Sequence, residues 1–220
     1  MFDVFGITFY GYGMFIGIGV WVAYEVVRRY GKIEERVLDQ LLWWVLPAGI
    51  IGARVYHVAD YWKRYYEYNW FDIFKIWNGG LGIWGAIIFG GTALFVFSQL
   101  KKMNFLNLFN SVAIGMPFAQ AIGRLGNWAN GELYGINGEP LFAYEAILNI
   151  LLGLFLIYLS RYKKFTGGVY LIGYGVIRIV LENLRLETNI WKVNGVPMAI
   201  IFGLMAIFFG CFLLFLRKRS

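Results

Sequence analysis

The sequence predicts an all-α polytopic membrane protein with seven transmembrane helices, and three observations support this prediction. Of the 220 residues, 60% are hydrophobic and only 15% are charged, and the mean hydropathy is +0.60. Soluble domains carry about 25% charged residues, so this chain has too few charges to cover a water-exposed surface of its size. The apolar residues lie in long runs without alternating polar positions, which favours lipid-facing helices over barrel strands.

Seven apolar segments have the length and composition of membrane-spanning helices, which need about 20 mostly apolar residues. They cover, to within a few residues, 6–27, 41–58, 79–100, 105–122, 142–159, 168–184 and 197–216. Met1-Phe2-Asp3 supplies no basic stretch of the kind that precedes a cleaved signal segment, so the first segment is expected to remain as a helix. The chain is therefore predicted to form one transmembrane domain over residues 1–220.

The basic residues between these segments are distributed unequally over the two sides of the membrane. Twelve of the twenty lysines and arginines follow the first, third, fifth and seventh segments, whereas six lie on the opposite side. Because cytoplasmic loops carry the excess of positive charge, the N-terminus is predicted outside and the C-terminus in the cytoplasm. The net charge of +7 is explained in the same way and does not indicate a nucleic-acid partner.

Arg54 and Arg178 are predicted to lie inside helices, where a charged side chain costs about 2.5–3.5 kcal/mol or more. The predicted orientation puts both in the outer half of the membrane, at the depth where Arg124 ends the fourth segment. Arg178, Glu182 and Arg185 share one helical face because they are three or four residues apart. Arginine stays charged and binds phosphate through two parallel hydrogen bonds, so we predict a phospholipid phosphate site here.

Two simpler interpretations remain open for these charges. The series Arg178, Glu182 and Arg185 could be an ion-pair ladder that only fixes helix packing. Arg54 could extend its side chain to the outer interface instead of lining a site. The convergence of arginines from several helices at one depth favours the phosphate site.

Residues 123–135, with the sequence GRLGNWANGELYG, combine polar side chains with four glycines directly after an apolar segment. Glycines let the backbone approach a ligand closely, and asparagine amides offer both donors and acceptors. A polar loop at membrane depth is tolerated only where it lines a cavity in the protein. Residues 123–141 are therefore predicted to form a short extracytoplasmic loop that holds a lipid headgroup, with a merely connecting loop as the alternative.

This stretch resembles the signature loop of the prolipoprotein diacylglyceryl transferases, polytopic enzymes of the bacterial plasma membrane. Further resemblances occur in the family's order at Phe9-Tyr10-Gly11, Gly52-Ala53-Arg54-Val55-Tyr56, Trp77-Asn78-Gly79-Gly80-Leu81, Pro140 with Tyr144-Glu145, and Leu171-Ile172-Gly173-Tyr174-Gly175 with Arg178, Glu182 and Arg185. The resemblance implies transfer of the diacylglyceryl group of phosphatidylglycerol to the lipobox cysteine of a prolipoprotein, with release of glycerol phosphate. It also implies a multi-pass plasma-membrane enzyme whose active site faces the extracytoplasmic side.

The resemblance and the chemistry of the residues together suggest a role for each candidate. Arg124 and Arg178 are expected to bind the phosphate, to neutralise the leaving group and to lower the thiol pKa from about 8.5. Glu182 would hold the arginines in place, and Glu145 would accept the thiol proton or bind glycerol hydroxyls. The expected phospholipid-binding residues are Arg54, Asn127, Asn130, Glu132, Tyr10, Arg185 and Gly135.

The chain departs from the family pattern near the expected chemistry. Trp84 stands where the family has histidine or tyrosine, and tryptophan cannot accept a proton, so a general-base role there does not carry over. The segment from Glu139 to Phe142 lacks the family's polar groups. The stretch between the signature loop and Tyr144 is very short, which indicates a reduced outer head. The alternative function is a catalytically inactive relative that binds or transports phospholipid.

No metal or organic cofactor is expected, because the phosphate ester of the donor lipid is already activated. One cysteine and one histidine exclude Cys-rich and His-rich metal sites. The G-x-G-x-x-G sequence at residues 80–85 follows no predicted strand, so close helix packing explains it better than dinucleotide binding. His57 is expected to be a hydrogen-bonded interfacial residue, Cys211 to be buried, and the aromatic residues 61–71 to lie on the outer surface or to gate substrate entry.

Overall fold

The computed structural model describes residues 2–4, 7–9, 11–162, 165–186 and 190–219, and most of this chain is helical. The helices are α1 (Gly11–Tyr30), α2 (Glu35–Asp60), α3 (Ile83–Leu100), α4 (Phe105–Ala113), α5 (Met116–Ala129), α6 (Leu141–Arg161), α7 (Thr166–Glu182) and α8 (Met198–Arg219). Between α2 and α3 lie a π-helical turn, η1 (Trp62–Tyr66), and two 3-10 turns, η2 (Trp70–Phe74) and η3 (Ile76–Asn78).

Two short antiparallel strand pairs complete the described elements. Strand β1 (Phe2–Val4) pairs with β2 (Ile7–Phe9), with Phe2 opposite Phe9. Strand β3 (Lys192–Val193) pairs with β4 (Val196–Pro197), just before α8. Neither pair adds a layer to the fold, so helix packing alone positions the functional groups.

Four described helices, α2, α3, α6 and α8, are long and apolar enough to cross a membrane. A fifth span results if α4 and α5, which meet at an angle of 44°, are counted as one broken span. Helices α1 and α7 fall in the first and sixth predicted segments. However, α7 has only 17 residues, and α1 carries Arg28 and Arg29 in its last turn. The prediction of an all-α, multi-pass membrane protein is confirmed, while the number of seven spans and the orientation of the termini remain predictions.

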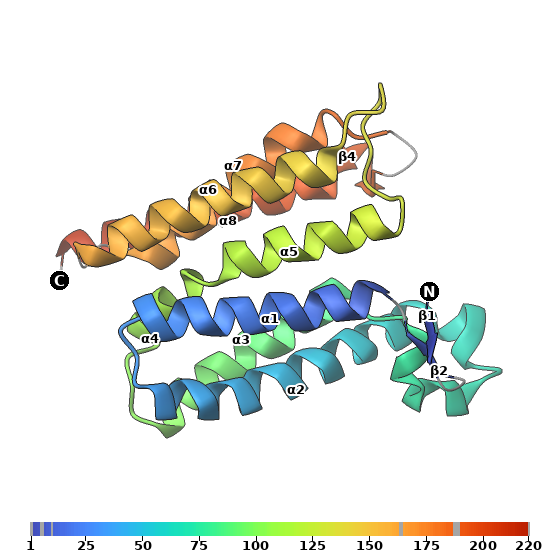
Figure 1. Cartoon of the computed structure of the whole chain (residues 1–220), viewed down its shortest axis with the longest axis horizontal. Coiled ribbons are helices and arrows are strands. Elements are labelled where there is room, and N and C mark those ends of the chain that lie inside the picture. Colours follow the sequence, from blue (N-terminus) through green and yellow to red (C-terminus); the bar gives the residue numbers. More distant parts are fainter. Residues whose placement is uncertain (1, 5–6, 10, 163–164, 187–189, 220) are drawn as a thin grey trace. The chain divides into compact units, whose positions relative to one another are not determined.

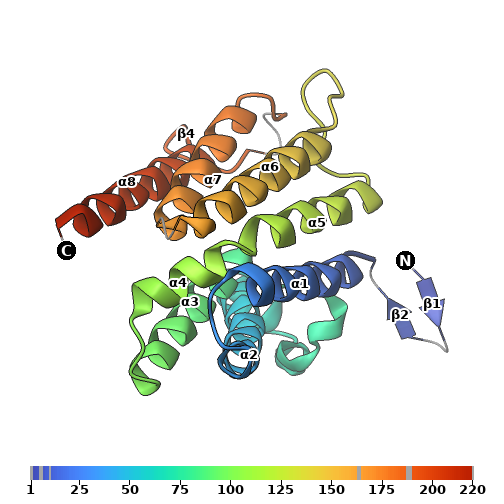
Figure 2. The same ribbon diagram turned by 60° about the vertical axis from the view of Figure 1, so that its left-hand side comes forward.

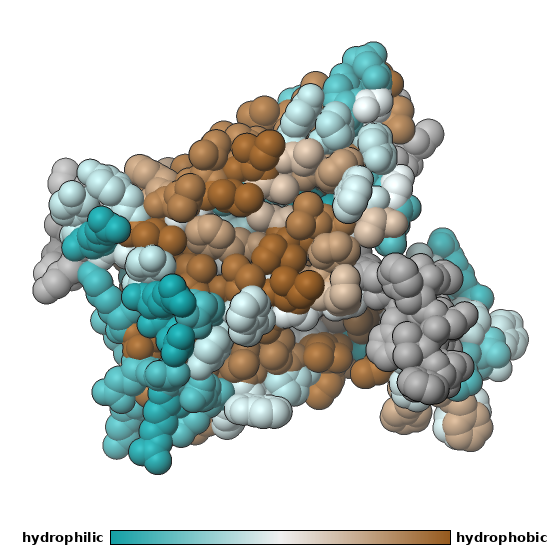
Figure 3. All heavy atoms as spheres, viewed as in Figure 1, coloured by the Kyte–Doolittle hydropathy of each residue, from teal (hydrophilic) through white to brown (hydrophobic). Residues whose placement is uncertain are grey.

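The exposed surface has the character expected of helices in lipid. In Figure 3, hydrophobic residues cover the sides of α1, α5 and α6, and hydrophilic residues gather at the helix ends. Large apolar side chains are strongly exposed, including Trp43 (79%), Phe208 (66%) and Trp21 (66%). Exposed apolar area of this extent requires an apolar surrounding or a partner surface.

The fourth predicted segment is not one straight helix. Helix α4 ends at Ala113, and α5 begins at Met116 with Pro117 in its first turn. Proline has no N–H for a helical hydrogen bond and fits the start of a helix, so the break falls here. Helix α5 then continues to Ala129, so the first half of the 123–135 stretch is helical and only the residues after it form a loop.

The described chain divides into two compact units, and residues 1–32 together with 109–220 form the first. Within it, α5 packs against α1 and α6, and α7 packs against α6 and α8. Figures 1 and 2 show α6, α7 and α8 running side by side. The buried core of this unit contains Ala113, Leu152, Leu156, Tyr170, Ile177 and Leu181.

Glycines bring the backbones of α7 and α8 into contact. A Cβ atom placed on Gly175 would lie 2.5 Å from the carbonyl oxygen of Gly203, and one placed on Gly210 would lie 2.6 Å from that of Gly168. Small residues at such crossings allow the close helix approach that drives association in membranes. The pattern of glycines therefore determines how α8 packs on α7.

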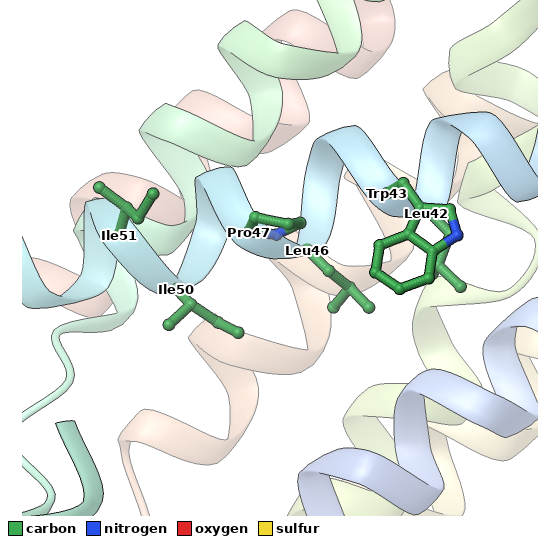
Figure 4. Close-up of a pocket in the computed structure, with 6 residues that line it drawn as sticks. All are labelled: Leu42, Trp43, Leu46, Pro47, Ile50 and Ile51. Atoms are coloured by element: carbon green, nitrogen blue, oxygen red, sulfur yellow. The ribbon is translucent and has the colours of Figure 1, made fainter.

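Residues 33–108 form the second unit, in which α2 packs against α3. A Cβ atom on Gly85 would lie only 1.9 Å from the carbonyl oxygen of Gly52, so close packing accounts for this glycine of the G-x-G-x-x-G sequence. Around Pro47, a groove of about 400 Å³ follows one face of α2 and is lined by Leu42, Trp43, Leu46, Pro47, Ile50 and Ile51 (Figure 4). None of these lining side chains is charged or able to transfer a proton.

Candidate functional site

Two of the arginines predicted to bind phosphate meet at one buried carboxylate. Arg124 Nη2 lies 2.7 Å from Glu145 Oε1, and Arg178 Nη1 lies 3.5 Å from Glu145 Oε2. The three residues come from three helices: Arg124 from the second half of α5, Glu145 from the beginning of α6, and Arg178 from the end of α7. The structure therefore brings Arg124 and Arg178 to the two sides of a single side chain.

A second carboxylate extends this cluster along α7. Glu182 Oε2 lies 3.7 Å from Arg178 Nη2 and 3.3 Å from Arg185 Nη1. The spacing of these three residues thus does produce an ion-pair ladder, and the ladder is continuous with the Arg124–Glu145 pair. Three arginines and two carboxylates leave one net positive charge, which equals the charge of one phosphodiester with opposite sign.

The acidic and basic groups of this arginine cluster differ in accessibility. The side chains of Glu145 and Glu182 are 2% and 3% exposed, whereas those of Arg124, Arg178 and Arg185 are 20–23% exposed. A buried carboxylate needs its cationic partners, because an unpaired buried charge is strongly destabilising. The carboxylates therefore orient the guanidinium groups from the buried side, and the accessible groups are cationic.

Polar residues of the 123–135 stretch continue the cluster as a chain of hydrogen bonds. Arg124 Nη1 donates to Asn127 Oδ1 over 3.0 Å, and Asn127 Nδ2 donates to Glu132 Oε2 over 3.2 Å. Asn130 Nδ2 donates to Glu132 Oε1 over 3.3 Å. The four polar residues singled out in this stretch are thus linked, and Glu132 is the exposed carboxylate among them.

Gly135 is buried where the loop packs against the end of α7. Gly135 forms a backbone bridge with Arg185, and the next residue, Ile136, donates its N–H to the Leu184 carbonyl over 3.0 Å. A Cβ atom on Gly135 would lie 2.3 Å from Glu139 Oε2 and 3.0 Å from the Leu184 oxygen. Gly135 therefore serves to dock the loop on α7, which indicates a structural contribution to the site.

Arg54 is used differently from the arginines of the cluster. Its side chain is in the second unit, is 7% exposed, and directs all five N–H donors of the guanidinium at backbone carbonyls. The acceptors are Ile73, Gly79, Gly80, Lys75 and Asp72. The Arg54 guanidinium thus holds the backbone of residues 72–80 in place. With all five of its N–H groups used in this way, Arg54 has none available for a lipid phosphate.

The remaining predicted residues are placed as follows. His57 Nδ1 lies 3.1 Å from the Tyr66 hydroxyl, and the His57 ring stacks on Tyr61, so His57 is hydrogen-bonded as expected. Tyr10 lies outside the described residues. Cys211 was expected to be buried but is exposed, because α8 packs mainly on α7 and its other faces are open.

The sequence analysis missed a layer of neutral polar residues beneath the cluster. Gln120 Nε2 donates to the Tyr170 hydroxyl over 2.9 Å, and Asn149 Nδ2 donates to the Glu145 carbonyl over 2.9 Å. Asn149 is fully buried. The signal that could have found them is their spacing, since Gln120 precedes Arg124 by four residues and Asn149 follows Glu145 by four.

Within the part of the chain that the structure describes, no group of three His, Cys, Asp or Glu side chains could hold a metal ion. The arginine cluster itself presents guanidinium groups at its accessible side. These groups can bind an anion and can stabilise negative charge that develops on a leaving phosphate.

Comparison with known proteins gives one consistent result. Residues 1–216 match the family described as prolipoprotein diacylglyceryl transferase. A protein of Finegoldia magna is 36% identical over 207 residues, covering 85% of this chain and 83% of its own length. Proteins of Clostridioides difficile (33% identical, 95% of this chain and 91% of the relative) and Enterococcus faecalis (32%, 100% and 90%) are also similar. All three are named phosphatidylglycerol–prolipoprotein diacylglyceryl transferase.

Proposed function

This chain belongs to the prolipoprotein diacylglyceryl transferase family, and we propose that it transfers the diacylglyceryl group of phosphatidylglycerol to the lipobox cysteine of a prolipoprotein. The names of its relatives contain both the donor lipid and the acceptor protein. The alternative of an inactive phospholipid-binding or transport protein is not favoured, because the matched relatives are named as transferases.

The observation that carries the proposal is the meeting of Arg124 and Arg178 at Glu145. In the reaction, the cysteine sulfur forms a bond to the glyceryl carbon that bears the phosphate. The bond between that carbon and the phosphate oxygen breaks, and its electron pair leaves with glycerol phosphate. Guanidinium groups aimed at the phosphate stabilise the charge that gathers on the leaving oxygen, which is the largest contribution expected from the protein.

The remaining polar residues support these two arginines. Glu145 and Glu182 hold the guanidinium groups from behind, and Arg185 adds positive charge at the cluster's edge. Asn127 and Asn130 orient the headgroup together with the loop that Gly135 docks. Glu132, rather than the buried Glu145, is our candidate for accepting the thiol proton, because its carboxylate is exposed and linked to Arg124 through Asn127.

We propose the same setting for the protein as for its family. Seven spans, with α1 and α7 as the first and sixth, would put the N-terminus outside and the C-terminus in the cytoplasm of a bacterial plasma membrane. The arginine cluster and the loop after α5 would then face the extracytoplasmic side, where secreted prolipoproteins emerge. The acyl chains of the donor would remain in the bilayer between the helices.

The direct test supplies the purified chain with phosphatidylglycerol and a peptide that contains a lipobox cysteine. Mass spectrometry should find a peptide heavier by one diacylglyceryl group, together with an equal amount of glycerol phosphate in solution. A peptide whose cysteine is replaced by serine should gain no mass. Tight phosphatidylglycerol binding without any mass gain would reject the transferase and leave the lipid-binding alternative.

A further inference from the structure

The layer of neutral polar side chains beneath the arginine cluster is in register with the charged residues. Gln120 on α5, Asn149 on α6 and Tyr174 on α7 are each four residues, or about 6 Å along the helix axis, from Arg124, Glu145 and Arg178. Each lies on the side away from the loop end of its helix. Three helices therefore repeat one arrangement, with charged groups in one layer and hydrogen-bonding groups in the next, which we call the neutral layer.

Contacts connect the two layers. Tyr174 interacts with Arg124, and its ring stacks on Tyr170 at a centroid distance of 6.0 Å. Tyr170 in turn accepts the hydrogen bond from Gln120. Asn149 reaches the charged layer through the backbone carbonyl of Glu145. The neutral layer is thus attached directly to the residues that we assign to the phosphate.

Two acceptor atoms in the neutral layer have no hydrogen-bond partner in the structure. They are Asn149 Oδ1 and Gln120 Oε1, and both are shielded from the surroundings. Asn149 is 0% exposed, and its amide nitrogen is already used by the Glu145 carbonyl. A buried polar atom without a partner is destabilising, and apolar residues at these positions would avoid this cost. The missing partner must be a donor, since both open atoms are amide oxygens.

We propose that the neutral layer accepts a hydroxyl group of the donor lipid's glycerol headgroup, with Asn149 as the residue that determines headgroup specificity. This inference rests on the proposed function. The headgroup hydroxyls are the hydrogen-bond donors of phosphatidylglycerol, and they lie on the far side of the phosphate from the diacylglyceryl carbon that reacts. When the phosphate is bound by the arginines and the headgroup points toward the neutral layer, a headgroup hydroxyl lies about one helical turn from the arginines. This is the depth of the unpaired oxygens of Asn149 and Gln120.

The unpaired oxygens would make the site prefer lipids whose headgroup carries a hydroxyl group. A site with buried acceptors leaves them unpaired when the ligand lacks a hydroxyl, and this rejects the wrong ligand more strongly than a missing apolar contact does. The headgroup reaches the layer past Arg124 and Arg178, whose side chains are about one-fifth exposed. The layer thus distinguishes glycerol from headgroups of equal charge that carry no hydroxyl.

The test compares two short-chain lipids with one negative charge each, phosphatidylglycerol and phosphatidylmethanol, because only the first has headgroup hydroxyls. For each lipid, kcat/KM of transfer to a lipobox peptide and the lipid-induced shift in melting temperature are measured. In Asn149→Leu, we expect the preference for phosphatidylglycerol to fall about 10- to 100-fold, with the value for phosphatidylmethanol unchanged. Without lipid, the variant should melt at the same or a higher temperature, because the orphan oxygen is gone.

Asn69→Leu is the matched control. Asn69 makes the same type of bond to the carbonyl four residues earlier, Tyr65, but is exposed, so its removal should leave the lipid preference unchanged. Gln120→Leu should reproduce the loss of preference and provides a second variant should Asn149→Leu fail to fold. An unchanged preference in both layer variants, or an equal loss with both lipids, overturns the proposal and leaves the layer as a purely structural feature.

Failure of the proposed function looks different in this design. If the unmodified chain transfers nothing from either lipid, the transferase assignment fails. The shifts in melting temperature still report whether the layer prefers the hydroxyl-bearing lipid. If the unmodified chain transfers normally and only the preference is insensitive to Asn149, the transferase assignment stands and the layer's role is rejected.

Discussion

At the scale of single residues, Arg124 and Arg178 differ in how closely their guanidinium groups approach the buried carboxylates. The Arg124–Glu145 distance of 2.7 Å is that of a charge-assisted hydrogen bond, whereas Arg178 lies 3.5 Å from Glu145 and 3.7 Å from Glu182. Arg178 thus retains more of its bonding capacity for an incoming anion. Arg124, in contrast, connects the buried carboxylate to the signature loop through Asn127.

The first prediction concerns this difference. Arg178→Lys keeps the charge but cannot bind phosphate through two parallel N–H groups, so kcat/KM for transfer should fall by roughly 100-fold. The peptide mass assay measures this loss. Arg161→Lys, at the exposed end of α6 far from Glu145, serves as the control of the same chemical exchange. Activity of Arg178→Lys close to that of the unmodified chain would contradict bidentate phosphate contact by this residue.

The second prediction concerns Glu145. Glu145→Gln leaves Arg124 and Arg178 without their buried anion, and breaking a buried pair costs about 3–5 kcal/mol. The melting temperature should therefore drop, and phosphatidylglycerol should restore a larger part of it than in the unmodified chain, since its phosphate supplies a replacement anion. Glu25→Gln, which removes a partner of Arg28 and Arg29 on an exposed surface, should change the melting temperature little. A variant that melts normally and gains nothing from lipid would count against the shared carboxylate.

The third prediction separates Arg54 from the cluster. In Arg54→Lys, three N–H donors on a flexible amine replace five in a fixed fork, so residues 72–80 should lose part of their order. Hydrogen exchange should accelerate at the amides of this segment, while the exchange of α5, α6 and α7 should not change. Protection of residues 72–80 equal to that of the unmodified chain would show that the five carbonyl contacts are dispensable.

Sequence reasoning reached the cluster but not the details of its bonding. Arg124 and Arg178 could be assigned to one site for two reasons. A charge in or next to an apolar segment is costly without a function, and the predicted topology puts both at the same depth in the membrane. Glu145 as their shared partner could not be predicted, since this depends on the rotation of α6 against α5 and α7. The role of Arg54 could not be predicted either, because its partners are backbone carbonyls. Every residue has one, so residue identity does not show which of them accept from Arg54.

At the scale of elements, glycine contacts set the distance between helices. Gly85→Ala would put a methyl group 1.9 Å from the Gly52 carbonyl oxygen, so α2 and α3 must separate. We expect a clearly lower melting temperature for this variant. Gly91→Ala on the same helix meets nothing within 4 Å and should be neutral or slightly stabilising, because alanine favours helices over glycine. Equal melting temperatures for both variants would refute the packing argument.

The segment between α2 and α3 should respond to acid. Lys75, with help from the Tyr65 hydroxyl, lowers the pKa of Asp72 below its usual value. A lowered pKa means that the folded segment is stabilised while Asp72 is charged, and that this contribution disappears as the pH falls through the folded-state pKa. Hydrogen exchange around residues 70–76 should accelerate, after correction for intrinsic rates, below about pH 4. Asp72→Asn should remove this acid response, and persistence of the response would contradict the assignment.

Element boundaries were predicted well where apolar runs end in charges and poorly where a helix continues through polar residues. The break between α4 and α5 follows from Pro117, which the apolar run concealed. The helical course of α5 through Asn127 could not be inferred, because glycines and asparagines there suggest a loop. Packing of α5 against α1 and α6 supports the helix against these local preferences.

At the scale of the whole molecule, the asymmetry of basic residues leads to the last prediction. In a chain with Cys211→Ser as background, Asn194→Cys should react with a membrane-impermeant maleimide in intact cells. Lys218→Cys, near the end of α8, should react only after the membrane is permeabilised, because the positive-inside rule predicts that this end is cytoplasmic. Labelling of both positions from outside would show that α8 does not cross the membrane, and the reverse pattern would show that α8 crosses it in the opposite orientation.

Composition was sufficient to identify a multi-pass membrane protein, because no soluble fold could cover so much apolar surface. The count of spans is harder to derive, since α7 is short and α1 ends in charged residues. The division into two units was not visible in the sequence at all. Helices of nearly uniform hydrophobicity give no indication of which of their faces meet.

The single excess positive charge of the arginine cluster has a consequence for turnover. Glycerol phosphate departs with a charge between about −1.5 and −2, more negative than the diester from which it came. Three uncompensated arginines would retain such a product and stall the enzyme after one round. By cancelling most of that attraction beforehand, Glu145 and Glu182, in the mechanism that we propose, let the glycerol phosphate dissociate, so the same carboxylates that shape the site also keep it from being poisoned by its own by-product.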